Sequence, residues 1–245
     1  MKRITTYIIN LPESIARRKY MEDLLSRYDF LKLEFIAAID GRIMSQEEIS
    51  SKFDIDEAYR RYGRRLNGGE IGCTLSHFKC YEKIMDSSES VALILEDDIS
   101  IMRNLSKLDL SRIDKILSTD EPCILFLSGD YWYWNKGAIT NVFSAVGSYA
   151  YFINKPAAYK ISQAISRPSN VADDWHAYKR LGIKLRAVYP YAIDANIIDL
   201  PSEINQEYWG YHRNKISIKY FISSCIIGLV KKLLICLGHF ESKKR

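Results

Sequence analysis

The sequence has few features of a secreted, disulfide-stabilised protein. Its five cysteines are an odd number and contain no CxxC pair. Nothing in this spacing indicates a disulfide framework or a zinc site. The first apolar run ends at Pro12 and is too short for the core of a signal peptide. We therefore expect a first strand here and a protein of a reducing, cytoplasmic compartment.

The sequence also lacks the glycine-rich loops that hold phosphates. Neither GxxxxGK[ST] nor GxGxxG occurs, which counts against enzymes that depend on such loops. There is no internal repeat and no low-complexity linker. Hydrophobic residues make up 47% of the 245 positions, enough to build a core and too many for a disordered chain.

Lys and Arg outnumber Asp and Glu only at the C-terminal end of the sequence. The formal net charge is +5, yet residues 211–245 alone carry +7, from eight Lys and Arg against one Glu. Residues 1–210 therefore carry −2. A nucleic-acid partner needs a basic face on the folded part, and this distribution does not provide one. We expect residues 1–210 to form one domain and residues 211–245 to form a basic tail.

Short apolar runs alternate with helical patterns along the first 190 residues. The runs predict strands near 5–11, 35–39, 91–95, 123–128, 144–153 and 184–188. Helical spacing predicts helices near 14–27, 70–85, 156 onward and 173–181, with short surface helices within 45–65. This alternation predicts an α/β fold with a mostly parallel central sheet flanked by helices, and ligands bind beyond the carboxyl ends of such strands.

Three consecutive carboxylates, Glu96, Asp97 and Asp98, follow the buried strand at 91–95. Adjacent carboxylates repel one another, and unpaired charge beside a core is costly. A hard cation such as Mn²⁺ or Mg²⁺ would relieve both costs. An acidic surface turn without a metal remains the alternative.

Several blocks along residues 4–190 resemble glycosyltransferase family 25, the lipopolysaccharide glycosyltransferases. The order and spacing agree as well as the residues. The matching blocks are Tyr7–Leu11 with Ser14, Arg17, Arg18 and Met21; Ala38–Gly41; Gly69–His77; Leu93–Asp98; and, more loosely, Gly147–Ile153 and Asp173–Asp174.

The resemblance implies a GT-A-like fold, a nucleotide-sugar donor such as UDP-galactose, and inversion at the anomeric carbon. It also implies that Glu96-x-Asp98 is the counterpart of the acid-x-acid metal motif of such folds. The acceptor implied is a glycolipid or an oligosaccharide of lipopolysaccharide or another surface glycan.

Further site residues follow from position and chemistry. Inversion needs a base that removes the acceptor's hydroxyl proton, and Asp173, Asp174 and then Asp130 are the candidates. The alternative for Asp173 and Asp174 is a structural role, because acidic residues are also favoured at the N-terminus of a helix. We expect an aromatic loop at Tyr131–Trp134, whose rings could stack on a sugar face. The expected donor-binding residues are Asn10, Arg17, Arg18, Asp40, Glu70, Ser76 and His77.

The tail contains an amphipathic pattern of its own. On a helical wheel, one face of the tail is apolar and consists of Ile218, Ile222, Ile226, Leu229, Val230, Leu233 and Leu237. Lys231 and Lys232 lie largely on the opposite face. The uninterrupted apolar stretch is shorter than the roughly 20 residues that span a bilayer. We expect an interfacial helix that holds the protein on an anionic membrane, at the inner face of the cytoplasmic membrane. Docking on the domain or a dimer contact is the alternative.

Two rival functions remain open at this point. A metal-dependent sugar-nucleotide or phosphoryl transferase would share the metal and the carboxylates. A non-catalytic membrane-surface module would have the tail as its function.

Overall fold

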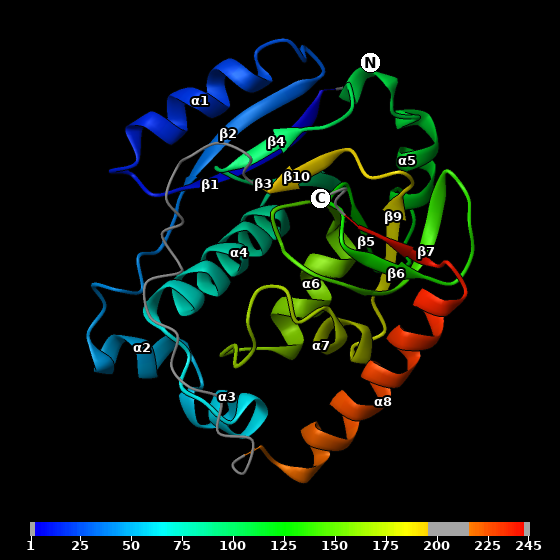
Figure 1. Ribbon diagram of the computed structural model, residues 1–245. Coiled ribbons are helices and arrows are strands. Elements are labelled where there is room, and N and C mark those ends of the chain that lie inside the picture. Colours follow the sequence, from blue (N-terminus) through cyan, green and yellow to red (C-terminus); the bar gives the residue numbers. More distant parts are fainter. Residues whose placement is uncertain (1–2, 196–215, 243–245) are drawn as a thin grey trace.

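A computed structural model describes residues 3–195 and 216–242, in which a twisted nine-stranded sheet runs through the molecule (Figure 1). The strands of the described residues are β1 (Ile4–Asn10), β2 (Leu31–Ala37), β3 (Val91–Glu96), β4 (Ile99–Ile101), β5 (Cys123–Phe126), β6 (Tyr131–Tyr133), β7 (Ile139–Ala145), β8 (Ala150–Asn154), β9 (Lys184–Val188), β10 (Ile193–Ala195) and β11 (Phe240–Glu241). Of these, β4 and β10 form a separate two-stranded sheet. The helices are α1 (Ile15–Leu25), α2 (Gln46–Lys52), α3 (Ile55–Tyr62), α4 (Gly68–Asp86), α5 (Leu110–Leu117), α6 (Lys155–Ala164), α7 (Trp175–Arg180) and α8 (Ile218–Cys236).

The sheet is mixed, which corrects the expected mostly parallel sheet. Its order is β11-β6-β7-β9-β5-β8-β3-β1-β2. β1 pairs in parallel with both β2 and β3, and β5 pairs in parallel with β9. β8 lies antiparallel between β3 and β5, because the chain returns through it after the β6–β7 meander. Hydrophobic runs predict that a strand is buried but carry no information on its direction.

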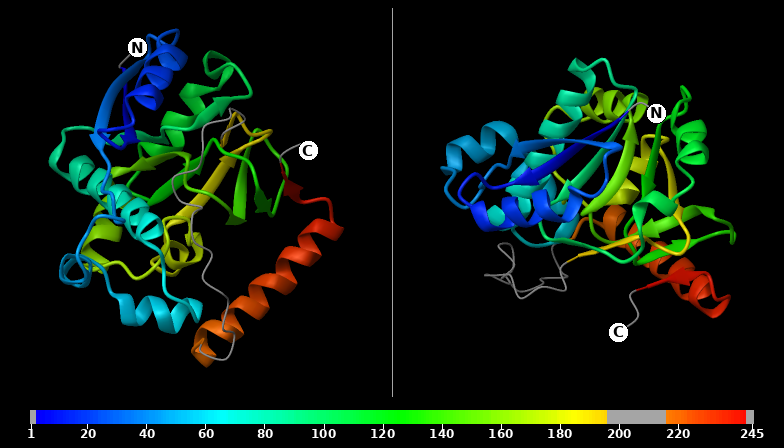
Figure 2. Two further views of the ribbon diagram at one scale, coloured as in Figure 1. Left: turned by 60° about the vertical axis from the view of Figure 1, so that its left-hand side comes forward. Right: turned by 90° about the horizontal axis from the view of Figure 1, so that it is seen from above.

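Helices cover both faces of the sheet, and each face has its own apolar core. One core packs residues of α4, α6 and α7 against the sheet, including Phe78, Ala157 and Trp175. The other packs α1 and α5 through residues such as Met21 and Ile113. Figure 2 shows the same layers from two further directions. The helices α2 and α3 lie outside these layers and close over a third, smaller apolar cluster.

Most of the aromatic segment expected as a loop is instead strand β6, which lies between β7 and the edge strand β11. Tyr131 and Tyr133 are buried, and Trp132 stacks on Phe240 of β11 with ring centroids 4.5 Å apart. The aromatic side chains of this segment are used for packing, because aromatic residues are favoured in strands and α8 and β11 cover this strand. The segment lines none of the three cavities described below, and Trp134 is its exposed member, so its role in sugar stacking stays a prediction.

Helix α8 docks along one side of the domain while leaving an apolar row exposed. Tyr220 is buried, donates a hydrogen bond to Glu57 and packs under Arg61 of α3. At the other end Leu234 is buried, and Lys231 lies 4.1 Å from the centroid of Trp132. The exposed row is Ile218, Phe221, Ile222, Ile226, Leu229, Leu233, Ile235 and Leu237. Over the described residues, no helix is both long and apolar enough to cross a membrane.

The expected boundary at residues 210 and 211 lies outside the described residues, as does most of the segment before α8.

Candidate functional site

A cleft opens where β1, β2 and β3 end, and the acidic cluster forms one of its walls. We call it the acidic cleft; its lining includes Arg17, Asp40, Ser76, Glu96, Asp97 and Asp98. Parallel strands β1, β2 and β3 bring their carboxyl ends to the same edge of the sheet, so residues far apart in the sequence meet here. The position of the site therefore follows the expectation from the strand order.

Within the acidic cluster, Asp97 is bonded to protein groups through both of its oxygens. It is buried, and Arg17 of α1 donates to its Oδ1 at 2.8 Å. Asn10, the last residue of β1, donates to its Oδ2 at 2.7 Å. Both oxygens are thus satisfied by charge-assisted or neutral hydrogen bonds, which tie the turn after β3 to β1 and α1. Asp97 thus helps to position the cluster through one hydrogen bond on each of its oxygens.

Asp98, in contrast, lacks sufficient compensation for its charge. The Arg17 guanidinium lies 3.5 Å from it, farther than from Asp97. Burial, followed by the charge of Glu96, raises the pKa of Asp98 to about 6. A carboxylate held in this way gains most from a nearby cation.

Glu96 is held by a chain of hydrogen bonds that reaches into the core. Ser148 donates to its Oε1 at 2.7 Å, and Nε2 of His77 lies 3.3 Å from the same oxygen. The other ring nitrogen of His77 is 2.7 Å from the Tyr151 hydroxyl. Burial alone would raise the pKa of Glu96, but the hydrogen bonds from His77 and Ser148 outweigh it and hold that pKa below its usual range. Glu96 is therefore an ionised carboxylate in a fixed orientation.

Cys73 joins His77 and Glu96 to form a group that could hold a metal ion. One ligand atom of each lies within 4.8 Å of the others. Thiolate and imidazole ligands suit zinc, and the hydroxyl of Tyr151 would orient the imidazole from behind. Burial raises the pKa of the Cys73 thiol well above its usual range, so a metal would have to displace its proton. The spacing of the cysteines in the sequence did not indicate this group, because Glu96 joins it from a distant part of the chain.

A second cavity, of about 350 Å³, adjoins the acidic cleft. We call it the side cavity. Glu96 and Cys73 line both spaces. Asp173 lines the side cavity and accepts a hydrogen bond from Gly147 N–H at 3.0 Å. Burial raises the pKa of Asp173, which makes it a stronger base than an exposed aspartate.

The neighbouring Asp174 has a different environment. Its Oδ2 accepts from Arg61 at 2.9 Å and from the Tyr62 hydroxyl at 3.1 Å, and its Oδ1 accepts from Ala177 N–H at the start of α7. Asp174 thus caps α7 and joins it to α3. Of the two aspartates, Asp173 alone lines the side cavity.

The opposite wall of the acidic cleft is the loop after β2, which carries Asp40. Two contacts of 2.8 Å join Asp40 to Arg42, and the hydrogen bonds from Arg42 lower the pKa of Asp40. Ser76 is buried and accepts from Ile39 N–H at 2.8 Å, so it fixes the loop. Gly72 is required beneath it, since a Cβ there would lie 2.3 Å from the Ile39 carbonyl oxygen.

Three of the expected residues lie differently. Arg18 is on the exposed side of α1, paired with Glu22 and stacked over Phe35. Asp130 accepts from Ser242 near the end of the chain and lines none of the three cavities. Glu70 lines the side cavity but is held by Arg64 and caps the start of α4.

Sequence reasoning did not identify Cys73, Ser148 and Arg64 as site residues. Cys73 and His77 are four apart on α4 and so share a face, which is a signal that the sequence contains. Ser148 and Arg64 reach the site from distant segments, so local spacing in the sequence does not connect them with it.

The chain is similar to several known glycosyltransferases. A model of glycosyltransferase family 25 (LPS biosynthesis protein) matches residues 3–175. A glycosyltransferase 25 family member of Aedes aegypti is 39% identical over 98 residues, 38% of this chain and 16% of that protein. Procollagen galactosyltransferase 2 of Mus musculus is 25% identical over 156 residues, 54% of this chain and 25% of that protein.

Among solved structures, the glycosyltransferase GlyE of Streptococcus pneumoniae TIGR4 aligns with a TM-score of 0.41 and 13% identity, covering 100% of this chain and 66% of that chain. The chain spans a quarter or less of the two curated relatives described above. The family model, however, covers well over half of the chain, including the acidic cleft and Asp173. The chain therefore belongs to glycosyltransferase family 25.

Proposed function

We propose that this glycosyltransferase moves galactose, with inversion, from UDP-galactose to a sugar of lipopolysaccharide or another surface glycan. The observation that carries the proposal is the adjacency of two cavities. Glu96 and Asp98 face one of them and Asp173 faces the other, with Glu96 common to both. Galactose is favoured because the mouse relative is named a galactosyltransferase. The mixed sheet flanked by helices is compatible with a GT-A-like arrangement.

A divalent cation, Mn²⁺ or Mg²⁺, fits Asp98 and Glu96. Burial and the charge of Glu96 raise the pKa of Asp98, so a cation beside it would favour its ionised form, and both residues offer the oxygen ligands that hard cations prefer. When bound, the cation would stabilise the charge that develops on the departing diphosphate. Asp97 acts indirectly, because its bonds to Arg17 and Asn10 hold the turn that carries the other two carboxylates.

Asp173 is our candidate for the base. It would accept the proton of the acceptor hydroxyl as that oxygen attacks the anomeric carbon, while the Gly147 N–H holds the carboxylate in place. Asp174 keeps a supporting role through Arg61. The apolar residues Ile9 and Ala38, which line the acidic cleft with Asp40, offer a surface for the nucleotide base and a carboxylate for the ribose hydroxyls.

The products of donor breakdown test this proposal. With UDP-galactose and Mn²⁺, the enzyme should release UDP and transfer or slowly hydrolyse galactose. A sugar-nucleotide or phosphoryl transferase would instead cleave within the diphosphate and yield UMP or galactose 1-phosphate. A thermal-shift panel of nucleotide sugars, with and without Mn²⁺, identifies the donor, because a ligand that binds only the folded state raises its stability. No Mn²⁺-dependent shift and no UDP release from any donor would refute the proposed function.

We also propose that residues 211–245 hold the enzyme on an anionic membrane surface, at the inner face of the cytoplasmic membrane. Support comes from the apolar row of α8, where Ile226 and Leu229 are 56% and 68% exposed. Docking of α8 on the domain does not compete with this role, because the docked side carries Tyr220 and Leu234 instead. Lys232 stays exposed, while Lys231 turns inward onto Trp132.

Co-sedimentation with phosphatidylglycerol vesicles tests the membrane proposal. Ile226→Asp with Leu229→Asp should abolish binding, since charge is placed in the apolar row. Ser106→Asp with Thr119→Asp adds the same charge at exposed positions elsewhere and should retain binding. High salt should weaken the wild-type interaction. Equal sedimentation of the two double variants would refute it.

A further inference from the structure

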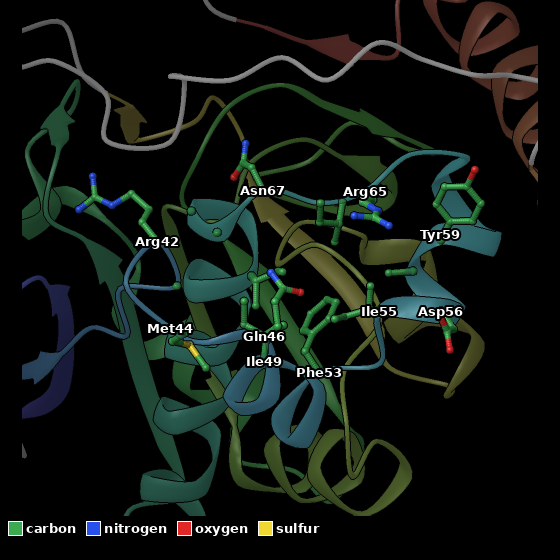
Figure 3. A pocket seen from close by; sticks show the side chains of 16 residues that line it. Arg42, Met44, Gln46, Ile49, Phe53, Ile55, Asp56, Tyr59, Arg65 and Asn67 are labelled. Atoms are coloured by element: carbon green, nitrogen blue, oxygen red, sulfur yellow. The ribbon is translucent and has the colours of Figure 1, made fainter.

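A third cavity, of about 880 Å³, lies beside the acidic cleft and has no part in the function derived above. It is enclosed by α2, α3, the first turn of α4 and the loop after β2 (Figure 3). We call it the α2–α3 cavity. Gly41, Arg42 and Gly69 line both this cavity and the acidic cleft, so a single loop and one helix turn separate the two.

The shared wall is thin because it is built from glycines. A Cβ on Gly41 would lie 2.1 Å from the carbonyl oxygen of Gly68, and a Cβ on Gly68 would lie 2.6 Å from that of Gly41. The loop and the start of α4 therefore touch through their backbones alone. Arg42, which is part of this wall, forms an ion pair with Asp40 in the acidic cleft. A ligand in the α2–α3 cavity therefore reaches the acidic cleft beside this contact, past Arg42 and Gly69, which line both spaces.

The cavity combines an apolar floor with a polar rim. Ile49, Phe53, Ala58 and Ile71 are buried in the floor, where they form the small cluster that is separate from the cores of the sheet. The rim carries Arg42, Gln46, Asp56, Tyr59, Arg65 and Asn67. Figure 3 shows Gln46 and Phe53 near the centre of the cavity, with Arg42 to one side and Asp56 and Tyr59 to the other.

This composition matches a sugar chain. A pyranose ring has an apolar C–H face and an edge of hydroxyl groups that both donate and accept hydrogen bonds. Amides such as Gln46 and Asn67 also donate and accept, while Tyr59 and the floor offer surfaces for the C–H face. The volume lies near the upper end of the roughly 300–1,000 Å³ typical of small-molecule sites, which favours more than one ring.

The donor has less reason to bind in this cavity. Its diphosphate needs the carboxylate cluster and Arg17, all of which line the acidic cleft and not the α2–α3 cavity. We propose that the α2–α3 cavity binds the oligosaccharide of the acceptor and that the end of the oligosaccharide passes Arg42 and Gly69, which line both spaces, into the acidic cleft. This inference rests on the proposed function and adds the site of the second substrate.

Helix α3 connects this cavity with the C-terminal helix. Asp56 and Tyr59 of α3 line the cavity, while Glu57 and Arg61 of the same helix contact Tyr220 of α8. An acceptor whose lipid stays in a membrane beside α8 would therefore have its sugar chain near this cavity. The arrangement favours a glycan that is attached to a lipid as the natural acceptor.

A blocking substitution at the rim tests the inference in the full chain. Gln46 is exposed and projects into the cavity, so Gln46→Trp fills the space without disturbing the core. Glu47→Trp is the matched control, because Glu47 is exposed on the same helix and does not line the cavity. The probes are oligosaccharides released from lipopolysaccharide by mild acid, with UDP-galactose and Mn²⁺ as the donor system. Donor hydrolysis without acceptor is measured in parallel.

Gln46→Trp should raise the KM for the oligosaccharides at least tenfold and leave donor hydrolysis and the donor KM within about twofold, whereas Glu47→Trp should change neither. Unchanged oligosaccharide KM in Gln46→Trp would overturn the inference. A wild-type enzyme that hydrolyses the donor but neither binds nor glycosylates the oligosaccharides would also overturn it. A rise in donor KM in Gln46→Trp would overturn it as well, because it would assign the cavity to the donor. Absence of both activities in the wild type would instead count against the proposed function.

Discussion

Replacing Asp98 by asparagine should remove activity and, at the same time, stabilise the metal-free protein. Asp98 has an ordinary pKa of 3.8 and a pKa raised to about 6 in the folded protein, chiefly by burial and the charge of Glu96. The folded state therefore holds this proton more tightly than the unfolded chain. Its stability should fall as the pH rises from about 4 to about 6 and remain reduced above that range.

The size of the effect follows from the same values. At about 1.4 kcal/mol per pH unit, the penalty reaches at most about 3 kcal/mol near neutral pH. Asparagine does not titrate and is nearly isosteric with the protonated acid. In EDTA, Asp98→Asn should therefore raise the free energy of unfolding by about 1–3 kcal/mol at about pH 8, and this gain should vanish near pH 4. Mn²⁺ should stabilise the wild type and not the variant.

Urea denaturation at several pH values, with EDTA or Mn²⁺, measures both effects. Asp97→Asn is the matched control, one residue away. Asp97 is paired with Arg17 and Asn10, so its substitution should destabilise the protein by about 2–3 kcal/mol, because it weakens a buried pair. If Asp98→Asn destabilises the metal-free protein, or if the two variants behave alike, our account of the cluster's charge is incorrect.

Three further predictions concern the base, the loop and the thiol. Asp173→Asn should lower kcat about 100-fold or more with little change in donor KM, whereas Asp174→Asn should chiefly lower the melting temperature; steady-state kinetics and thermal melts separate the two, and near wild-type kcat in Asp173→Asn would exclude it as the base. Gly72→Ala should cost about 2 kcal/mol or more in urea denaturation, since its Cβ meets backbone at 2.3 Å, whereas Gly228→Ala faces open space in α8 and should stabilise by up to about 1 kcal/mol; equal effects would contradict the close-packing argument. Zn²⁺ should inhibit Mn²⁺-dependent donor hydrolysis, and Cys73→Ser should relieve the inhibition; inhibition that persists in Cys73→Ser would place the zinc elsewhere.

Much of the local structure could be predicted from the sequence. The apolar run before Pro12, the helical spacing around His77 and the run before Glu96 correspond to β1, α4 and β3. The amphipathic pattern from Ile218 onward corresponds to α8. Its expected apolar row is largely exposed, except that Val230 is half-buried. These predictions succeed because periodicity and capping act between residues that are close in the chain.

Other features depended on contacts that no local pattern contains. The order and direction of the strands, and hence the insertion of β8 between β3 and β5, follow from long-range pairing. The aromatic segment at Tyr131–Trp134 is mostly a strand for the same reason, since β11 and α8 arrive from the other end of the chain to cover it. Short strands such as β4 and β10 were not predicted, because each is stable only through its partner.

The sequence by itself determined that three carboxylates lie at the carboxyl end of a buried strand, and that a helix bearing Cys73 and His77 precedes this strand in the chain. Only the tertiary structure decided how the carboxylates differ. Arg17, 80 positions away, pairs with Asp97, while His77 and Ser148 hold Glu96 and leave Asp98 with excess charge. The physical reason is that charge and burial depend on neighbours in space, whereas a motif records only neighbours in sequence.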